Sequence, residues 1–252
     1  MPSRLRRADP QTSALDLRAS DETIRIALRR VTGAKRFTLR VRSATRDVIL
    51  TMPHRASIAS AREFAERHVA WIGARIRRLP QPVRFEPGAV FPLRGVPHVI
   101  VHRPEARGYI WIERADAGPA SICVAGAREH LARRIGDYLR REAQGDIKAA
   151  VRTHAEKIEV SIRSISVRDT TSRWGSCSVA GALNFSWRLI MAPAYVLDYL
   201  AAHEVAHRIH LDHSPKFWAL AHHLAPETDR AESWLKAHGA ELHRYGASEP
   251  AS

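Results

Sequence analysis

Four histidines in the stretch HEVAHRIHLDHSPKFW, residues 203–218, are the side chains best suited to chemistry in this chain. His203 and His207 are four residues apart, and Glu204 follows the first of them. On a helix this spacing puts both imidazoles on one face, about 6 Å apart along the axis, so both can reach one ion. Zn²⁺ accepts imidazole nitrogen, and a neighbouring carboxylate can then act as a general base. The pattern therefore predicts a zinc site.

The third protein ligand of such a site is not decided by this motif alone. A catalytic zinc ion needs three protein ligands and one open position. His210 lies on the same predicted helix face, but about 10 Å from His203 along a straight helix. Glu227 begins a later helix, and a helix-borne glutamate completes the site in many HExxH enzymes. His213 follows Asp212, which can adopt a left-handed turn, and such a turn would favour His213 among the three candidates.

Two predicted helices carry the histidines and the loop between them. Pro193 precedes the first helix, over residues 194–211. Ser214 and Pro215 form an N-cap and first-turn signal for the second helix, which ends near residue 224. The loop that contains His213 is therefore expected to be short and to change the direction of the chain.

A hairpin is predicted just before these helices. The stretches RWGSCS and ALNFSWRL are typical of two strands, separated by VAG. Zinc peptidases often hold substrate as an extra strand beside such an edge. Arg173 could stabilise an oxyanion or bind a substrate carboxylate or phosphate, and Trp174 would lie next to it. Arg173 and Trp174 are therefore candidate substrate-binding residues, with ordinary core packing as the alternative for Trp174.

The first part of the chain predicts strands and one helix. Residues 22–31 and 36–52 alternate polar and apolar side chains, which is typical of amphipathic strands with a wet, arginine-bearing face. Residues 57–79 have apolar side chains at helical spacing, and Ser60 with Glu63 matches a capping box. We therefore expect a single helix over 57–79.

The order of these elements predicts an α+β protein. Residues 1–125 would form a basic, β-rich region with the one helix. Residues 126–245 would form a zincin-like catalytic core, which begins with a long helix from about 127 to 158. In this core a small sheet packs on the histidine helix and the C-terminal helices. Residues 246–252 are expected to be a disordered tail.

Composition sets the broad class of the protein. The chain has 252 residues, of which 45% are hydrophobic and 26% charged, as in ordinary globular proteins. Its two cysteines form no CxxC pair, and the first residues contain no apolar segment typical of a secretory signal. No stretch approaches the roughly 20 apolar residues that a membrane helix needs. These features favour a cytoplasmic protein without membrane contact.

The net charge of +14 is unevenly distributed. Residues 1–100 hold 20 Lys and Arg against 8 Asp and Glu, whereas residues 201–252 hold 5 against 7. Arginine binds phosphates bidentately, so the first region could contact nucleic acid without sequence preference. A merely solubilising charge is the alternative. Few aromatic residues interleave with these arginines, which argues against stacking on single strands.

Several stretches together resemble the YgjP-like family of predicted metal-dependent hydrolases, relatives of the SprT-like and WLM zinc peptidases. RWGSC and HExxHxxxxxHSPxFW are the specific pieces, while RFTLRV, VILTMPHRASIASAREFAERHVAWI and FEPGAVFPLRGVPH extend the similarity over about residues 22 to 240. The resemblance implies zinc bound by His203, His207 and His213, with Glu204 as general acid/base. It also implies a compact gluzincin-like core, but no particular substrate.

Three functions are compatible with these residues. The first is a zinc metallopeptidase with one zinc per chain, in which metal-activated water attacks a peptide carbonyl and Glu204 transfers protons. The second is a metal-dependent hydrolase of nucleotides or other phosphoanhydrides, which Arg173 would serve equally well. The third is a nucleic-acid-binding module with a structural zinc, which is disfavoured because three histidines and a free carboxylate describe an open site. A peptide or protein substrate is therefore the leading expectation.

Overall fold

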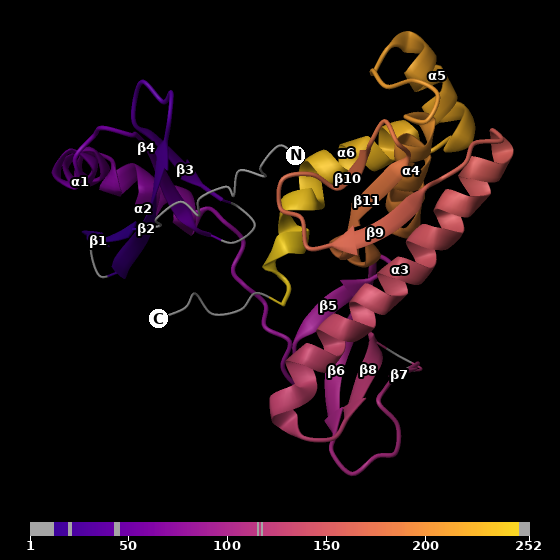
Figure 1. Ribbon diagram of the computed structural model, residues 1–252. Helices are drawn as coiled ribbons and strands as arrows, with labels where there is room; N and C mark the ends of the chain where they lie inside the picture. The colour runs from indigo at the N-terminus through magenta and orange to yellow at the C-terminus, as the bar shows by residue number, and fades with distance from the viewer. Residues whose placement is uncertain (1–12, 20–21, 43–45, 115, 117, 247–252) are drawn as a thin grey trace, which may run out of the picture. The chain divides into compact units, whose positions relative to one another are not determined.

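The computed structural model describes residues 13–19, 22–42, 46–114, 116 and 118–246 (Figure 1). The chain divides between Gln81 and Pro82 into two compact units. Sequence patterns suggested a division after residue 125 instead. Residues 82–125 group with the second unit because their sheet shares one hydrophobic core with the long helix that follows. The expected tail lies outside the described residues, apart from Gly246.

The first unit is a four-stranded sheet with two helices. Its elements are β1 (Ser13–Ala19), β2 (Glu22–Val31), β3 (Thr38–Val41), β4 (Val48–Pro53), α1 (Ile58–Arg67) and α2 (Val69–Arg77). The strand order is β1-β2-β4-β3, in which β2 and β4 are parallel and the other neighbours antiparallel. The helices pack on the apolar face of the sheet, where Ile26, Leu50 and Ile72 are fully buried.

The predicted strand over 36–52 is two strands. β3 and β4 pair antiparallel, and the chain reverses where the Arg42 N–H donates to the Asp47 carbonyl at 2.9 Å. Arg46 lies in the left-handed region, with φ of 61°. Alternation of polar and apolar residues continues through both strands, so periodicity alone could not reveal the reversal.

The predicted helix over 57–79 is also divided, at His68. The imidazole Nδ1 of His68 lies 2.7 Å from the Phe64 carbonyl oxygen, and the His68 N–H bonds instead to the Ala65 carbonyl. The side chain thus takes a carbonyl that a continuous helix would need. The expected capping box is wrong as well, since Ser57 is the N-cap and its hydroxyl accepts the Ser60 N–H.

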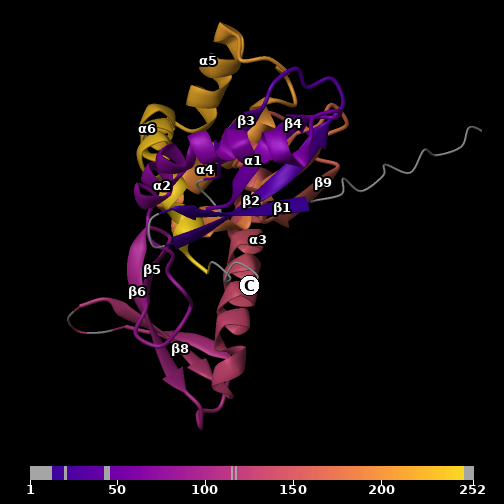
Figure 2. The same ribbon diagram turned by 90° about the vertical axis from the view of Figure 1, so that its left-hand side faces the viewer.

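The second unit is built along α3 (Leu131–Lys157), which is continuous through Gly145. Near its first half lies the sheet β5-β6-β8-β7, as both views show (Figures 1 and 2). The strands are β5 (Val90–Leu93), β6 (Val96–Arg103), β7 (Ile110–Glu113) and β8 (Ala120–Ala125). Ile100 and Ile122 of this sheet join Leu131 and Ile135 of α3 in the core.

The second half of the unit contains the elements expected to carry the site. They are β9 (Ser164–Arg168), β10 (Gly175–Cys177), β11 (Ala182–Ser186), a 3₁₀ turn (Trp187–Met191), α4 (Ala194–Ala206), α5 (Pro215–Leu224), α6 (Thr228–His238) and a 3₁₀ turn (Gly239–Arg244). The sheet order is β10-β11-β9. The predicted hairpin is confirmed by antiparallel pairing of β10 with β11, and β9 is parallel to β11. The predicted α+β class, with a small sheet beside the histidine helix, is confirmed.

The turn between β5 and β6 helps to place the start of α4. Arg94 and Gly95 have φ of 51° and 78°, as expected for a tight hairpin turn. A Cβ on Gly95 would lie 2.9 Å from the Cα of Pro193, so only glycine permits this approach. The Arg94 guanidinium also donates to Asp146 of α3 at 2.7 Å. The β5–β6 turn therefore contacts both Pro193, which precedes α4, and the long helix α3.

Among the described residues, no helix combines the length and apolar character needed to cross a membrane. Most residues of α4 are buried, including Val196, Leu200 and Ala201. α4 is therefore the central helix of this core, and the histidines at its end are held by a rigid element.

Candidate metal centre

The site lies where α4 ends and α5 begins. α4 stops at Ala206 with His207 as its C-cap, not at residue 211 as predicted. The His207 ring Nδ1 lies 3.0 Å from the His210 carbonyl oxygen, so the chain turns back on this imidazole. Asp212 does not adopt the expected left-handed conformation. Its carboxylate instead accepts the Ser214 N–H at 3.3 Å, which shapes the loop before α5.

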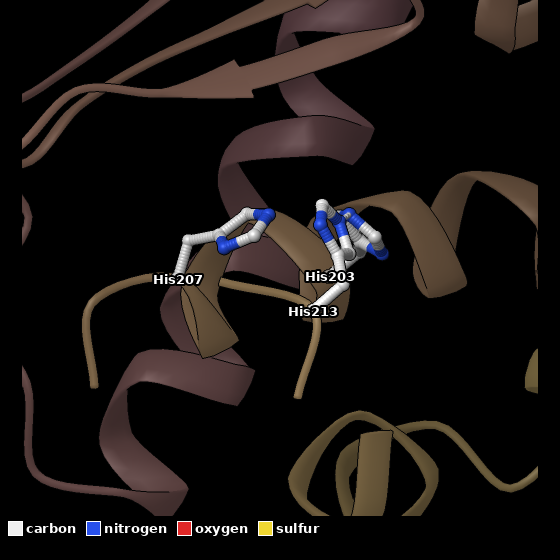
Figure 3. Close-up of side chains that lie close together, drawn as sticks. All are labelled: His203, His207 and His213. Carbon is white, nitrogen blue, oxygen red and sulfur yellow. Dashed lines mark hydrogen bonds between the residues drawn. The ribbon is translucent and has the colours of Figure 1, made fainter. Parts of the chain in front are cut away.

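Three imidazoles converge across this loop. Figure 3 shows the His207 ring pointing towards those of His203 and His213. The Nε2 atoms of His203 and His213 are 3.2 Å apart, and one ring nitrogen of each histidine lies within 4.8 Å of the others. Bonds of 2.0–2.1 Å to a tetrahedral zinc ion put neighbouring ligand atoms about 3.3 Å apart. The separation between His203 and His213 therefore matches a zinc-sized ion, and the widest separation, up to 4.8 Å, would shorten when an ion binds.

The other two candidate ligands lie outside this cluster. His210 contributes its backbone carbonyl to His207, and its imidazole is not among the grouped ligand atoms. Glu227 pairs with Arg230 within the first turn of α6. Of the candidates for third ligand, the fold brings only His213 to the two helix histidines.

The imidazoles are held in the form that binds metals. Burial, together with the neighbouring charges of His207 and His213, lowers the pKa of His203 to about 4. Burial also lowers the pKa of His207. Metal coordination requires neutral imidazole, because a protonated ring has no free lone pair. These histidines are therefore ready ligands at neutral pH.

Hydrogen bonds at the far ring nitrogens orient two of the histidines. Nδ1 of His203 lies 3.3 Å from the Tyr199 hydroxyl, which in turn donates to Glu232 of α6 at 3.1 Å. Nδ1 of His207 can donate to the His210 carbonyl in the same way. Such partners fix the tautomer that leaves Nε2 free for a metal. The hydroxyl stays protonated, since burial and Glu232 raise the pKa of Tyr199.

The sequence gives only a partial indication of Tyr199 and Glu232, which orient the His203 ring. Tyr199 is one turn before His203 on α4, a spacing at which helical side chains meet. Glu232 has no such signal, because it reaches Tyr199 from a different helix. Neither residue was identified from the sequence.

An aromatic surface supports the three imidazoles. Phe217 is fully buried, and its ring centroid lies 4.9 Å from His203, 4.5 Å from His207 and 4.8 Å from His213. Trp218 packs beside two of them. Phe217 and Trp218 of the HSPxFW stretch therefore pack against the imidazole rings and limit their movement. The motif itself did not reveal this role.

Glu204 is buried beside the histidines. Only 4% of its surface is exposed, and its Oε2 has no hydrogen-bond partner among the described residues. Burial raises the pKa of Glu204 to about 8, against the opposing charge of Arg173. A buried carboxyl without a partner is costly for folding alone and is typical of functional sites. Glu204 therefore has the properties of a proton-transfer residue.

Gly175 of the RWGSC stretch makes room for this carboxylate. A Cβ at this position would lie 2.8 Å from Cγ and 2.9 Å from Cδ of Glu204. Real Cβ atoms almost never approach so closely, so any side chain would displace Glu204. The glycine therefore couples the hairpin to the end of α4.

Changing Gly175→Ala is expected to lower turnover by about 10-fold or more, since a shift of about 1 Å in a reacting group can cost more than that. Overpacking should also reduce the free energy of unfolding by about 1–3 kcal/mol. Zinc content should be unchanged, because the methyl group meets Glu204 and none of the histidines. Gly145→Ala is the matched control, since a Cβ there meets nothing within 4 Å. Equal activity of both variants would contradict this coupling.

The two candidate substrate-binding residues differ in their surroundings. Arg173 is exposed, and its charge acts on Glu204, so it borders the same space. Trp174 is half-buried, with its ring stacked on His243 at 4.9 Å and packed against Gly239. The Trp174 ring therefore fastens the hairpin to the last 3₁₀ turn, while Arg173 is available to a ligand.

The donor set as a whole fits a divalent metal. Three imidazoles would supply the ligands, the exposed His213 leaves one side accessible, and Oε2 of Glu204 has no partner among the described residues. Such a donor set leaves one coordination position open, whereas a structural zinc site has four protein ligands.

Comparison with known proteins agrees with this geometry. The family model described as YgjP-like, metallopeptidase domain, matches residues 35–238, which include the hairpin, the histidine helix and the loop to His213. Neither the curated proteins nor the solved structures gave a match. Metallopeptidase domains are hydrolases that use a divalent metal. The predicted family is confirmed, and the chain belongs to the YgjP-like family of metallopeptidase domains.

Proposed function

We propose that the protein is a zinc-dependent metallopeptidase that holds one zinc per chain with His203, His207 and His213. One observation supports this above all: three imidazoles meet beside the buried Glu204 carboxyl, whose Oε2 has no partner among the described residues. Structural zinc sites have four protein ligands and no need for a free acid. The arrangement thus argues against a binding module with a structural zinc.

Each residue would have a distinct role in peptide hydrolysis. A zinc ion at the three imidazoles supplies Lewis-acid polarisation of the carbonyl and lowers the pKa of water. Glu204 takes the proton from the attacking water and delivers it to the leaving amine nitrogen. Tyr199 and the His210 carbonyl keep the ligand rings oriented. The hairpin strand β10 lies beside Glu204 and could pair with an extended peptide.

The raised pKa of Glu204 suits both halves of this cycle. A group that must accept and then return a proton works best when its pKa is near the working pH. Burial brings the pKa of Glu204 to about 8, whereas the positive charge of Arg173 favours its ionised form. The exposed guanidinium of Arg173 is also placed to bind a substrate carboxylate or to stabilise an oxyanion.

A second candidate is hydrolysis of nucleotides or other phosphoanhydrides. Its specific support is Arg173, because a guanidinium beside the site can bind a phosphate bidentately. The same three imidazoles and Glu204 would then act on a phosphoryl group. This reaction needs no extended substrate along β10, which distinguishes it from the first.

A substrate panel separates the two reactions. Zinc-loaded protein is incubated with casein-derived peptides and, separately, with nucleoside triphosphates, and amines and phosphate released are measured. We expect peptide cleavage that is lost with a chelator and restored by zinc. Phosphate release alone, absent from the Glu204→Gln variant, would replace the peptidase by the phosphoanhydride hydrolase. Release of neither product from any member of the panel would count against both.

We also propose that the protein acts in the cytoplasm. Cys123 and Cys177 are both free, the first buried and the second half-buried. Free thiols persist in a reducing compartment, whereas secreted domains tend to use them in disulfides.

A further inference from the structure

The sheet of the first unit has one face on which neither of the described helices of this unit, α1 and α2, packs. Side chains of paired residues share a face, so the register assigns each position. Ala27 and Arg40 both pair with Ile49, and α1 and α2 pack on the opposite face, which carries Ile26 and Leu50. The uncovered face is therefore that of Ala27, Ile49 and their neighbours two residues away.

This uncovered face is strongly basic. We name its exposed arginines the arginine face; they come from three of the four strands and are Arg18, Arg25, Arg29 and Arg40. None of them forms an ion pair or a side-chain hydrogen bond with a described residue. Asp16, opposite Arg25, is the only described acidic residue of the strands on this face. Small or uncharged side chains such as Ala27 and Thr51 lie between the arginines and leave them accessible.

An aromatic hollow lies at the outer edge of the same sheet. Among the described strands, β3 pairs with β4 alone, so it forms an edge of the sheet. Beside that edge is a hollow of about 410 Å³, lined by Arg36, Phe37, Thr38, Leu39, Phe64, His68 and Trp71. Trp71 is 50% exposed, although it is one of the largest apolar side chains. Thr38 belongs both to the hollow and, opposite Thr51, to the uncovered face.

We propose that this face and hollow together bind single-stranded nucleic acid. Each guanidinium of the arginine face can bind a phosphate bidentately, and the described residues supply these arginines with no ion-pair partner. Trp71 and Phe37 offer planar surfaces on which an unpaired base can stack. In a duplex the bases are paired and stacked inside the helix, and an acidic polypeptide contains no bases. The combination of charge and exposed aromatic rings therefore favours a single strand. This revises the expectation from the sequence, which argued against stacking because few aromatic residues interleave with the arginines; Phe37 and Trp71 come together in the fold.

Salt dependence is the first part of the test. The full chain is titrated into a labelled oligothymidine of about 20 nucleotides, and anisotropy gives the Kd. Four phosphate contacts predict that binding weakens roughly 50-fold between about 50 mM and about 200 mM salt, because counterions are released. A duplex of the same length should bind more weakly. Equal or tighter binding of the duplex would overturn the single-strand assignment.

Charge reversal with a matched control locates the site. Arg25→Glu, Arg29→Glu and Arg40→Glu together should weaken binding by more than about 10-fold at the lower salt. Reversal of three exposed arginines of this unit that line neither the arginine face nor the hollow, Arg55, Arg62 and Arg77, changes the net charge equally and should cost less than about 3-fold. Equal losses in both triple variants would show an effect of net charge only and overturn the proposal. Glutamine versions repeat the comparison if the glutamate triple does not fold.

The hollow is tested by Trp71→Ala. Loss of one stacked base should weaken oligothymidine binding by roughly 5-fold or more, while binding of polyphosphate, which has no bases, should not change. Equal affinity of the unaltered protein for polyphosphate and oligothymidine would exclude base stacking. Binding to anionic phospholipid vesicles but not to oligothymidine would replace nucleic acid by a membrane surface. None of these results depends on the metal centre.

Discussion

Replacing Glu204 by glutamine is expected to lower turnover by about 100-fold or more while zinc binding is retained, because a positioned proton-transfer group contributes that much. Glutamine has the size of glutamate but cannot accept the proton of the attacking water. The side chain is not one of the three grouped ligands, so metal affinity has no reason to fall. Steady-state rates on the substrate found in the panel, with metal content measured on the same samples, check this result.

The same variant should be at least as stable as the unaltered protein. Oε2 of Glu204 is buried without a partner, and an ionised group in that position opposes folding. A neutral amide removes the charge, so the melting temperature should stay the same or rise. Glu232→Gln is a useful comparison, because this acid also lies near the site but bonds to Tyr199 and not to substrate. Unchanged turnover of Glu204→Gln on every substrate would remove this residue from the mechanism.

His213→Ala is expected to weaken zinc binding by more than about 100-fold, beyond the 10- to 100-fold typical of losing an outer hydrogen-bond partner. His213 supplies one of only three grouped ring nitrogens, and its Nε2 lies 3.2 Å from that of His203. His203→Ala and His207→Ala should behave in the same way. Competition with a chromophoric chelator gives the affinities, and elemental analysis gives the number of zinc ions, with one per chain expected.

His210→Ala is the matched control for this series. It removes an imidazole three residues from His213, but it keeps the backbone carbonyl that the His207 ring contacts at 3.0 Å. Zinc affinity should therefore be nearly unchanged. Glu227→Ala should also keep the metal, since that side chain pairs with Arg230. Full zinc in His213→Ala together with loss in Glu227→Ala would show that the third ligand has been assigned wrongly.

Much of the site was determined by local sequence. The spacing of His203, Glu204 and His207 depends only on helical periodicity, so their arrangement on α4 could be predicted. Ser214 and Pro215 act within one turn, and α5 begins at Pro215 as expected. The β10–β11 hairpin was also predictable, because two short strands joined by a tight turn need no distant partner.

The limits of local patterns are visible in the same region. The helical spacing of apolar residues continues past the observed end of α4, and it also continues through the break between α1 and α2 at His68. At His68 the imidazole takes the Phe64 carbonyl that a continuous helix would use, and after α4 the His207 ring contacts the carbonyl of His210 in the loop. Such side-chain competition leaves no trace in an apolar pattern. Periodicity likewise ran through β3 and β4 without showing the reversal between them.

Tertiary structure alone decided which residues from distant segments meet. It brings Glu232 of α6 to Tyr199 and fits Gly175 of β10 against Glu204. It also joins residues 82–125 to the core of α3, where sequence patterns had placed a boundary at 125. In the first unit, Phe37 and Trp71 are 34 residues apart, so their shared hollow could not be seen as a pattern.

The physical reason for this difference is the range of the interactions. Helical spacing, caps and tight turns depend on atoms within about one or two turns of the chain, so the residues that make them are neighbours in sequence. Metal second shells, close glycine contacts and aromatic hollows depend on how separate elements pack, and packing is set by many buried contacts at once. The sequence by itself therefore determined how His203, Glu204 and His207 are arranged on α4, and the tertiary structure decided what surrounds them.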